Sequence, residues 1–244
     1  MENKKYELTN YTIKRDGKTL HRIKALRDII IETQGLNTTI KKGRLGGYIE
    51  SENNLSQSGN CWVGDTAKIY GNAIVRDNAY VGGNTEVYDN AGVLDEAVVD
   101  GNNIIHNNTV VTGHAYIREN VHLCGSATVG DDVMLWGIIE VSGHTDLRGN
   151  LSIVDDTKIS KTNHAIGIGP LPSLHGKNYN NYISFYKCGD GINVYTGHFD
   201  PTLHNHTYDI DEFKVIIDKI GSTDECFKEV YHKAIDLAKI IIEN

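Results

Sequence analysis

Histidines are the side chains of this sequence best suited to acid–base or metal chemistry, and they fall in two groups. His106 and His122 lie in the middle of the chain, and each imidazole is a candidate general base. His198, His204 and His206 crowd a short stretch nearer the end. A His-x-His pair places two imidazoles on one side of a strand, which is compatible with zinc. Solvated polar side chains are the alternative for both groups, and we predict no metal and no cofactor.

A glycine-rich stretch between the two histidine groups is a candidate anion-binding loop. Glycines let backbone N–H groups approach a phosphate closely, and nearby Ser, His and Lys side chains add donors. A tyrosine ring can stack on a nucleotide base. The stretch lacks the spacing of a nucleotide-binding P-loop, so an ordinary connecting segment is the alternative. The candidate ligand-binding residues are Gly167, Gly169, Ser173, His175, Lys177, Tyr179, Tyr182 and His198.

An internal repeat sets the elements that must position these side chains. An aliphatic residue returns at every sixth position without insertion or deletion. A second, usually small residue follows four positions later, as in Ala67, Ala73 and Ala79, with Asn103 as the polar misfit. The repeated aliphatic positions are Val63, Ile69, Val75, Val81, Val87, Val93, Val99, Ile105, Val111, Ile117, Leu123, Val129, Leu135, Val141, Leu147, Ile153 and Ile159.

Residues that tolerate a positive φ separate these positions, as at Gly71-Asn72 and Asp89-Asn90. Each hexad therefore predicts a short strand followed by a corner, and three such sides close a triangular turn. The strands then make roughly five to six turns spaced about 4.8 Å apart. We predict a mainly β fold, a parallel β-helix with an aliphatic interior.

The segment before the repeat has a different pattern. Residues 6–24 alternate around Asp16-Gly17, which predicts a β-hairpin with a two-residue turn. An open end of the coil exposes unpaired backbone groups, and we expect the hairpin to cap them.

The segment after the repeat predicts a small α+β module. Residues 182–187 and 192–199 favour two strands, and Asp209 and Ser222 begin two helices with capping-box spacing. We therefore divide the chain into an N-terminal β cap and lead-in (1–62), a β-helix (63–160), a crossing loop (161–181) and a C-terminal ββαα module (182–244).

One outward face of the predicted coil is unusually apolar for a surface. A contiguous apolar patch typically marks an interface. We interpret it as the contact with a neighbouring subunit, in a three-fold homotrimer, or with the C-terminal module; rings that cover the coil within one chain are the alternative. The predicted interface residues are Trp62, Tyr80, Val98, Tyr116, Met134 and Trp136.

Composition excludes several classes of protein. The 244 residues carry 24 Lys and Arg against 32 Asp and Glu, a formal net charge of −8, so general nucleic-acid binding through a basic surface is excluded. No apolar run reaches the roughly 20 residues of a membrane span, and the start has no apolar signal. The four cysteines are widely separated and predict neither disulfides nor a zinc knuckle. We expect a cytoplasmic protein without membrane contact.

The repeated Val-x-Gly-Asn-Ala-x pattern resembles the hexapeptide-repeat, left-handed β-helix superfamily. The left hand is implied by that resemblance. The leader, residues 20–28 and 46–63, resembles that of a bacterial and phage family of hexapeptide-repeat proteins commonly labelled transferases or polymer-forming proteins. The tail resembles the module found on phage members, which implies the host cytoplasm for a phage-encoded chain.

The resemblance also brings an enzymatic alternative. Acyltransferases of the superfamily use one histidine as general base, bind acyl-CoA between coils and close the site with a loop extruded from the coil. His106 and His122 would be the catalytic candidates here. The repeat between residues 63 and 159 has no room for such a loop, which favours a protein without catalytic residues.

The function that the sequence favours is a non-enzymatic binding protein of phage type. Its oligomer would hold a small anionic, nucleotide-like ligand or a host protein between the coil and the C-terminal module. Sequestration of that ligand could antagonise host defence. An acyl-CoA-dependent acyltransferase and a purely structural scaffold are the two alternatives.

Overall fold

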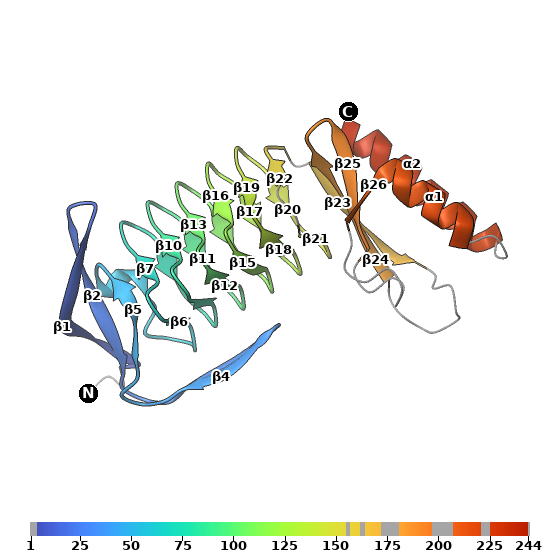
Figure 1. The fold of residues 1–244 in the computed structure, drawn as a ribbon. Helices are drawn as coiled ribbons and strands as arrows, with labels where there is room; N and C mark the ends of the chain where they lie inside the picture. The colour runs from blue at the N-terminus through green and yellow to red at the C-terminus, as the bar shows by residue number, and fades with distance from the viewer. Residues whose placement is uncertain are drawn as a thin grey trace.

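The chain is an elongated β-solenoid with β-hairpins at its start and an α+β module at its end, as a computed structural model shows (Figure 1). The structure describes residues 4–154, 157–161, 164–171, 181–196, 207–220 and 225–243. The predicted mainly β fold with a parallel coil is confirmed, and the coil makes about 6 turns.

Two hairpins precede the solenoid. The first joins β1 (Tyr6–Arg15) and β2 (Lys18–Ala25), with Asp16 and Gly17 at φ 47° and 76°, so the predicted hairpin and its turn are confirmed. The second, which the sequence analysis missed, joins β3 (Ile29–Thr33) and β4 (Leu36–Ile40).

The solenoid has three parallel faces, each a sheet named here after one strand. The β7 face contains β7 (Lys68–Ile69), β10 (Glu86–Val87), β13 (Ile104–Ile105), β16 (His122–Leu123), β19 (Ile139–Val141) and β22 (Thr157–Ile159). The β8 face contains β8 (Ile74–Val75), β11 (Gly92–Val93), β14 (Val110–Val111), β17 (Thr128–Val129) and β20 (Asp146–Leu147). The β6 face contains β6 (Trp62–Val63), β9 (Tyr80–Val81), β12 (Val98–Gly101), β15 (Tyr116–Glu119), β18 (Met134–Gly137) and β21 (Ser152–Ile153).

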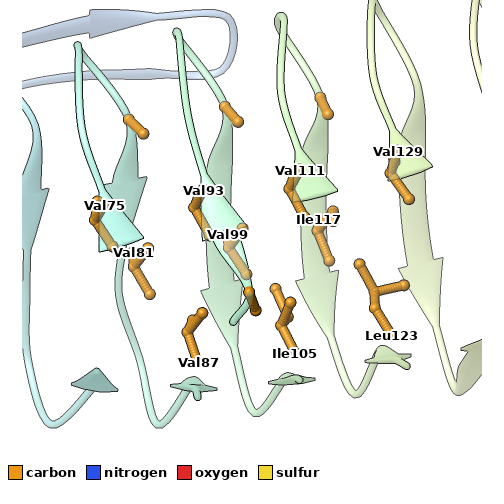
Figure 2. Packing of buried hydrophobic residues seen from close by; sticks show 14 of the residues in the cluster. Val75, Val81, Val87, Val93, Val99, Ile105, Val111, Ile117, Leu123 and Val129 are labelled. Atoms are coloured by element: carbon orange, nitrogen blue, oxygen red, sulfur yellow. The ribbon is translucent and has the colours of Figure 1, made fainter. Parts of the chain in front are cut away.

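Successive turns pair residues that are eighteen positions apart, which confirms the predicted three-sided turn. Val81 pairs with Val99, and Val99 pairs with Ile117. Every predicted aliphatic position from Val63 to Ile159 is buried, and these side chains stack along the interior (Figure 2). Each large aliphatic side chain removed from water stabilises the coil by roughly 1.5–3 kcal/mol, so the interior column is its main source of stability.

The corners of the solenoid have the backbone conformation expected from their residues. Asp77, Asp89 and Gly71 have φ values of 60°, 58° and 69°. The polar misfit Asn103 is fully buried, and its amide donates to the Asp100 carbonyl at 2.9 Å and accepts from the Val121 backbone N–H at 2.9 Å. Asn103 is therefore tolerated because its hydrogen-bonding groups have partners inside the coil.

The first hairpin closes the N-terminal end. β2 pairs with β5 (Leu45–Ile49), and β5 pairs in parallel with β7, so the hairpin continues the β7 face beyond the first turn. A short 3-10 helix, η1 (Glu52–Asn54), and the bridge between Leu55 and Val75 complete that turn. The hexad pattern starts at residue 63, but the strands and bridges of the coil begin earlier, at β5.

The C-terminal module has four strands and two helices. Its antiparallel sheet runs β23 (Ala165–Leu171), β24 (Asn181–Cys188), β25 (Gly191–Tyr195) and β26 (Thr207–Asp209), followed by α1 (Ile210–Ile220) and α2 (Glu225–Glu243). The predicted ββαα order therefore gains two strands, and part of the expected crossing loop is strand β23. As predicted, Asp209 caps α1: its carboxylate accepts from the backbone N–H of Asp211 at 2.9 Å. Among the residues that the structure describes, neither α1 nor α2 is long and apolar enough to cross a membrane.

The module packs on the last turn of its own solenoid. The Ser184 hydroxyl accepts from the Ser152 backbone N–H at 2.7 Å, and Thr157 donates to the Lys187 carbonyl at 2.8 Å. Tyr186 is fully buried within the solenoid core, whereas Phe185, its neighbour in the strand, packs toward the helices. Neighbouring side chains of β24 thus point to opposite faces of the sheet, and both faces are covered.

Candidate functional site

The β7 face carries the chemistry-bearing side chains of the solenoid. A residue on either side of a buried aliphatic position points outward, because side chains alternate along a strand. His122 precedes Leu123 and pairs in register with Glu140 of the next turn. His106 and Cys124 each follow a buried aliphatic residue, so they lie in the neighbouring column.

Three aromatic rings, those of Tyr70, Tyr88 and His106, form a stack on the β7 face, and the His122 ring lies beside the last of them. Tyr70 and Tyr88 have ring centroids 5.1 Å apart, Tyr88 and His106 5.0 Å, and His106 and His122 5.1 Å, with interplanar angles of 6°, 14° and 11°. The spacing follows from the separation of adjacent strands, about 4.8 Å. The stack restricts the ring plane of His106, and His122 lies edge to edge with that ring, because its Nε2 faces the Nε2 of His106 at 2.8 Å.

The two histidines are hydrogen-bonded to each other. His106 Nε2 and His122 Nε2 are 2.8 Å apart, so one ring donates and the other accepts. His106 Nδ1 lies 3.7 Å from an Asp89 carboxylate oxygen. Burial, and then the neighbouring His122, hold the pKa of His106 below its usual value. Both effects favour a neutral His106 imidazole, which can accept a proton or bind a metal.

Cys124 completes a cluster of three potential metal ligands. Its sulfur and one ring nitrogen each of His106 and His122 all lie within 4.8 Å of one another. Burial and the nearby Glu140 carboxylate raise the pKa of the Cys124 thiol. In the absence of a cation the side chain is therefore a neutral thiol rather than a reactive thiolate.

An open groove of about 490 Å³ lies beside this cluster, between the β7 face and the turn that joins β24 to β25. We call it the junction groove. Its charged groups are Glu140 and Lys158, whose side chains pair at 2.7 Å. The groove is lined by Asn120, His122, Ile138, Ile139, Glu140, Thr157, Lys158, Cys188 and Gly189.

The structure changes the interpretation of the predicted anion-binding loop. Gly167 and Gly169 lie in strand β23, where Gly167 is paired with Ser184 rather than placed in a loop. A Cβ at Gly167 would meet the Asn150 carbonyl oxygen at 2.2 Å, so this glycine permits close approach of the module to the solenoid. Tyr182 lies in strand β24. Ser173, His175, Lys177, Tyr179, His198, His204 and His206 fall outside the described residues.

The predicted interface face is partly covered within one chain. Trp62 and Val98 are buried, and the ring of Tyr116 lies 3.1 Å from where a Cβ of Gly35 would sit, at the tip of the β3–β4 hairpin. Ile29 and Ile31 of that hairpin belong to the solenoid core cluster. Tyr80 and Met134 are half-buried, and Trp136 is 43% exposed.

Sequence reasoning missed a buried lysine–cysteine pair at the N-terminal cap. Lys5 is fully buried, and its Nζ lies 3.0 Å from Cys61 Sγ and 3.2 Å from the Ser58 carbonyl oxygen. Burial lowers the pKa of Lys5 and raises the pKa of Cys61. Nothing in the local sequence distinguishes Lys5 from Lys4, which is half-exposed and pairs with Glu52. Cys188 and Gly189, which line the junction groove, were also missed, because they lie outside the hexad repeat.

Comparison with known proteins gives no assignment: no protein-family model and no curated protein sequence matches the chain.

Proposed function

We propose that the chain is a non-enzymatic binding protein that holds a small anionic, nucleotide-like ligand in the junction groove. The groove volume, about 490 Å³, falls within the roughly 300–1,000 Å³ typical of ligand sites. Lys158, His122 and Asn120 supply donors along its lining. An anion that approaches Lys158 competes with Glu140 for the ammonium group and gains the donors of the neighbouring turn.

The observation that carries this proposal is the uninterrupted solenoid. Strands from β6 to β21 follow one another at six-residue spacing, and no loop extends from the described turns to close over His106 and His122. A site that stays open to water on a rigid support suits capture more than acyl transfer, because transfer needs water excluded from the reacting groups.

The wider biological setting is part of the same proposal. The resemblance to phage members supports a phage-type protein that sequesters a ligand or a host protein in the host cytoplasm and antagonises host defence. Trp136, which is 43% exposed, supports self-association into a homotrimer through the uncovered end of the β6 face.

Native mass spectrometry of freshly purified protein tests this function, because it reads subunit number and co-purified small molecules together. Calorimetry with nucleotides then measures binding to the wild type and to Lys158→Ala, for which at least a tenfold loss is expected. Lys68→Ala is the matched control, since Lys68 pairs with Glu86 in the same column of the β7 face, away from the groove. The proposal is overturned if the protein carries and acquires no anionic molecule, or if both variants bind equally.

An acyl-CoA-dependent acyltransferase is the second candidate, and one observation favours it. His122 borders the junction groove and is hydrogen-bonded to His106, which lies beside Asp89. A histidine oriented in this way can act as a general base. Acetyl-CoA binding in calorimetry and turnover that His122→Ala abolishes would favour the enzyme over the binding protein. A purely structural scaffold would show neither ligand binding nor turnover.

A further inference from the structure

We propose that His106, His122 and Cys124 form a mononuclear zinc site on the β7 face, with the fourth coordination position open to solvent beside the junction groove. The three donor atoms lie within 4.8 Å of one another. Two imidazole nitrogens and one thiolate are a donor set that suits a borderline-soft divalent ion, and three protein ligands with one open position is a common zinc arrangement.

The geometry of the cluster is close to what zinc requires. Tetrahedral zinc with Zn–N bonds of about 2.0–2.1 Å and a Zn–S bond of about 2.3 Å separates its nitrogens by roughly 3.3 Å and nitrogen from sulfur by roughly 3.6 Å. The two Nε2 atoms are 2.8 Å apart, and the sulfur lies within 4.8 Å of both ligand nitrogens. To bind the ion, the two rings must turn so that both Nε2 lone pairs point at it and the nitrogens separate, while the paired strands hold the backbones in place.

The protonation states that the three ligands need are also compatible with zinc. Both Nε2 atoms must lose their hydrogen to bind the ion, so each neutral ring carries its proton on Nδ1. For His106 this places an N–H opposite the Asp89 carboxylate, which lies 3.7 Å away. A carboxylate that accepts from the far nitrogen of a zinc-bound histidine orients the ring and raises its basicity. The Cys124 thiol releases one proton to solvent when the sulfur binds the cation.

The charges around the cluster favour a cation. Asp89 lies beside His106, and Glu140 pairs in register with His122 on the neighbouring turn. Lys158, on the next turn of the β7 face, is paired with Glu140 at 2.7 Å. The zinc site does not depend on the proposed capture of an anionic ligand, because its ligands are all within the chain.

Metal titration tests the site directly. Chelator-treated full-length protein is titrated with Zn²⁺ alone in a calorimeter, and one ion per chain with release of about one proton is expected. Co²⁺ replaces zinc in the same protein, and thiolate-to-cobalt charge transfer in the near ultraviolet reports the Cys124 bond. His106→Ala, His122→Ala and Cys124→Ser should each weaken binding by at least a hundredfold, and Cys124→Ser should also abolish the charge-transfer band.

Two further variants make the result specific. Asp89→Asn should weaken zinc binding by about tenfold, the usual range for loss of an outer partner. His114→Ala is the matched control, because His114 is an exposed solenoid histidine paired with Glu96 at 3.2 Å, and it should bind zinc as the wild type does.

Three outcomes overturn the site: no zinc uptake, uptake that survives Cys124→Ser unchanged, or uptake abolished only by the double variant His204→Ala/His206→Ala. Circular dichroism of each variant confirms that the solenoid is folded. Nucleotide binding measured on the zinc-free protein separates a failure of this site from a failure of the proposed ligand capture.

Discussion

The β6 and β7 faces of the solenoid are built by the same hexads, yet the rest of the chain treats them differently. The β3–β4 hairpin lies along the β6 face and contributes Ile29 and Ile31 to the core cluster (Figure 1). The β1–β2 hairpin touches the β7 face through polar contacts: Arg15 pairs with Glu86 at 2.9 Å, and Tyr70 donates to Asp16 at 3.0 Å.

The difference teaches that the repeat determines the inside of the coil, whereas segments outside the repeat determine what its outside can do. The β6 face is apolar and partly covered, and Trp136 is the most exposed of its predicted interface residues. The β7 face keeps its ring stack and its His–Cys cluster open beside the junction groove.

The largest effect should come from the interior shared by both faces. Ile105 is fully buried, whereas its neighbour Ile104 is 42% exposed on the β7 face. Ile105→Ala should lower the free energy of unfolding by about 2–5 kcal/mol, because it leaves a cavity in a close-packed core. Ile104→Ala should change it by no more than about 0.5 kcal/mol. Urea denaturation measures both, and equal effects would contradict the inward column.

The second effect concerns the cover of the β6 face. Ile31 is 1% exposed and Ile30 is 51% exposed, so the two residues of one strand face opposite ways. Ile31→Ala should lower the free energy of unfolding by about 2 kcal/mol. This is the low end for such a change, because a two-stranded hairpin can shift to fill part of the cavity. Thermal unfolding and dye binding to exposed apolar surface provide the measurement. Ile30→Ala is the control, and a larger loss there would refute the assigned cover.

A smaller effect should come from the polar contact on the β7 face. Arg15→Gln removes the pair with Glu86, whose side chain is 15% exposed, while that of Arg15 is 46% exposed. The expected loss is below about 1 kcal/mol, because water screens the exposed end of the pair. A double-mutant cycle with Glu86→Gln isolates the interaction. The coupling should shrink in high salt, and a salt-independent coupling would contradict a screened contact.

The smallest effect should be a pH dependence of stability. The pKa of His106 is depressed in the folded protein below 6.5, so between the two values the unfolded chain binds more protons. Stability therefore rises with pH through that window and levels off above it. His106→Gln should flatten this rise when unfolding is measured across a pH series in the presence of chelator. A steeper rise in the variant would contradict the assigned direction.

Much of the fold could be predicted, and less of the site. Short-range patterns predicted the buried aliphatic positions from Val63 to Ile159, the Asp16-Gly17 turn and the Asp209 cap. All three features are found in the structure. His106, His122 and Cys124 each flank a repeated aliphatic position, Ile105 or Leu123, so the hexad period is consistent with their common face. It could not give their separation, because the tautomers, rotamers and ring stacking that bring two nitrogens to 2.8 Å depend on neighbouring turns. The left hand of the coil stays a prediction of the resemblance.

By itself the sequence determined the interior of this protein, because a six-residue period repeats one local choice many times and each turn packs only on its neighbours. Only the tertiary structure decided which outward surfaces remain open. The β3–β4 hairpin, the buried Lys5–Cys61 pair and the packing of Tyr186 on the last turn each join segments far apart in the chain or outside the hexads. Such contacts have no period, and burial of apolar surface and satisfaction of backbone groups select them once the solenoid exists.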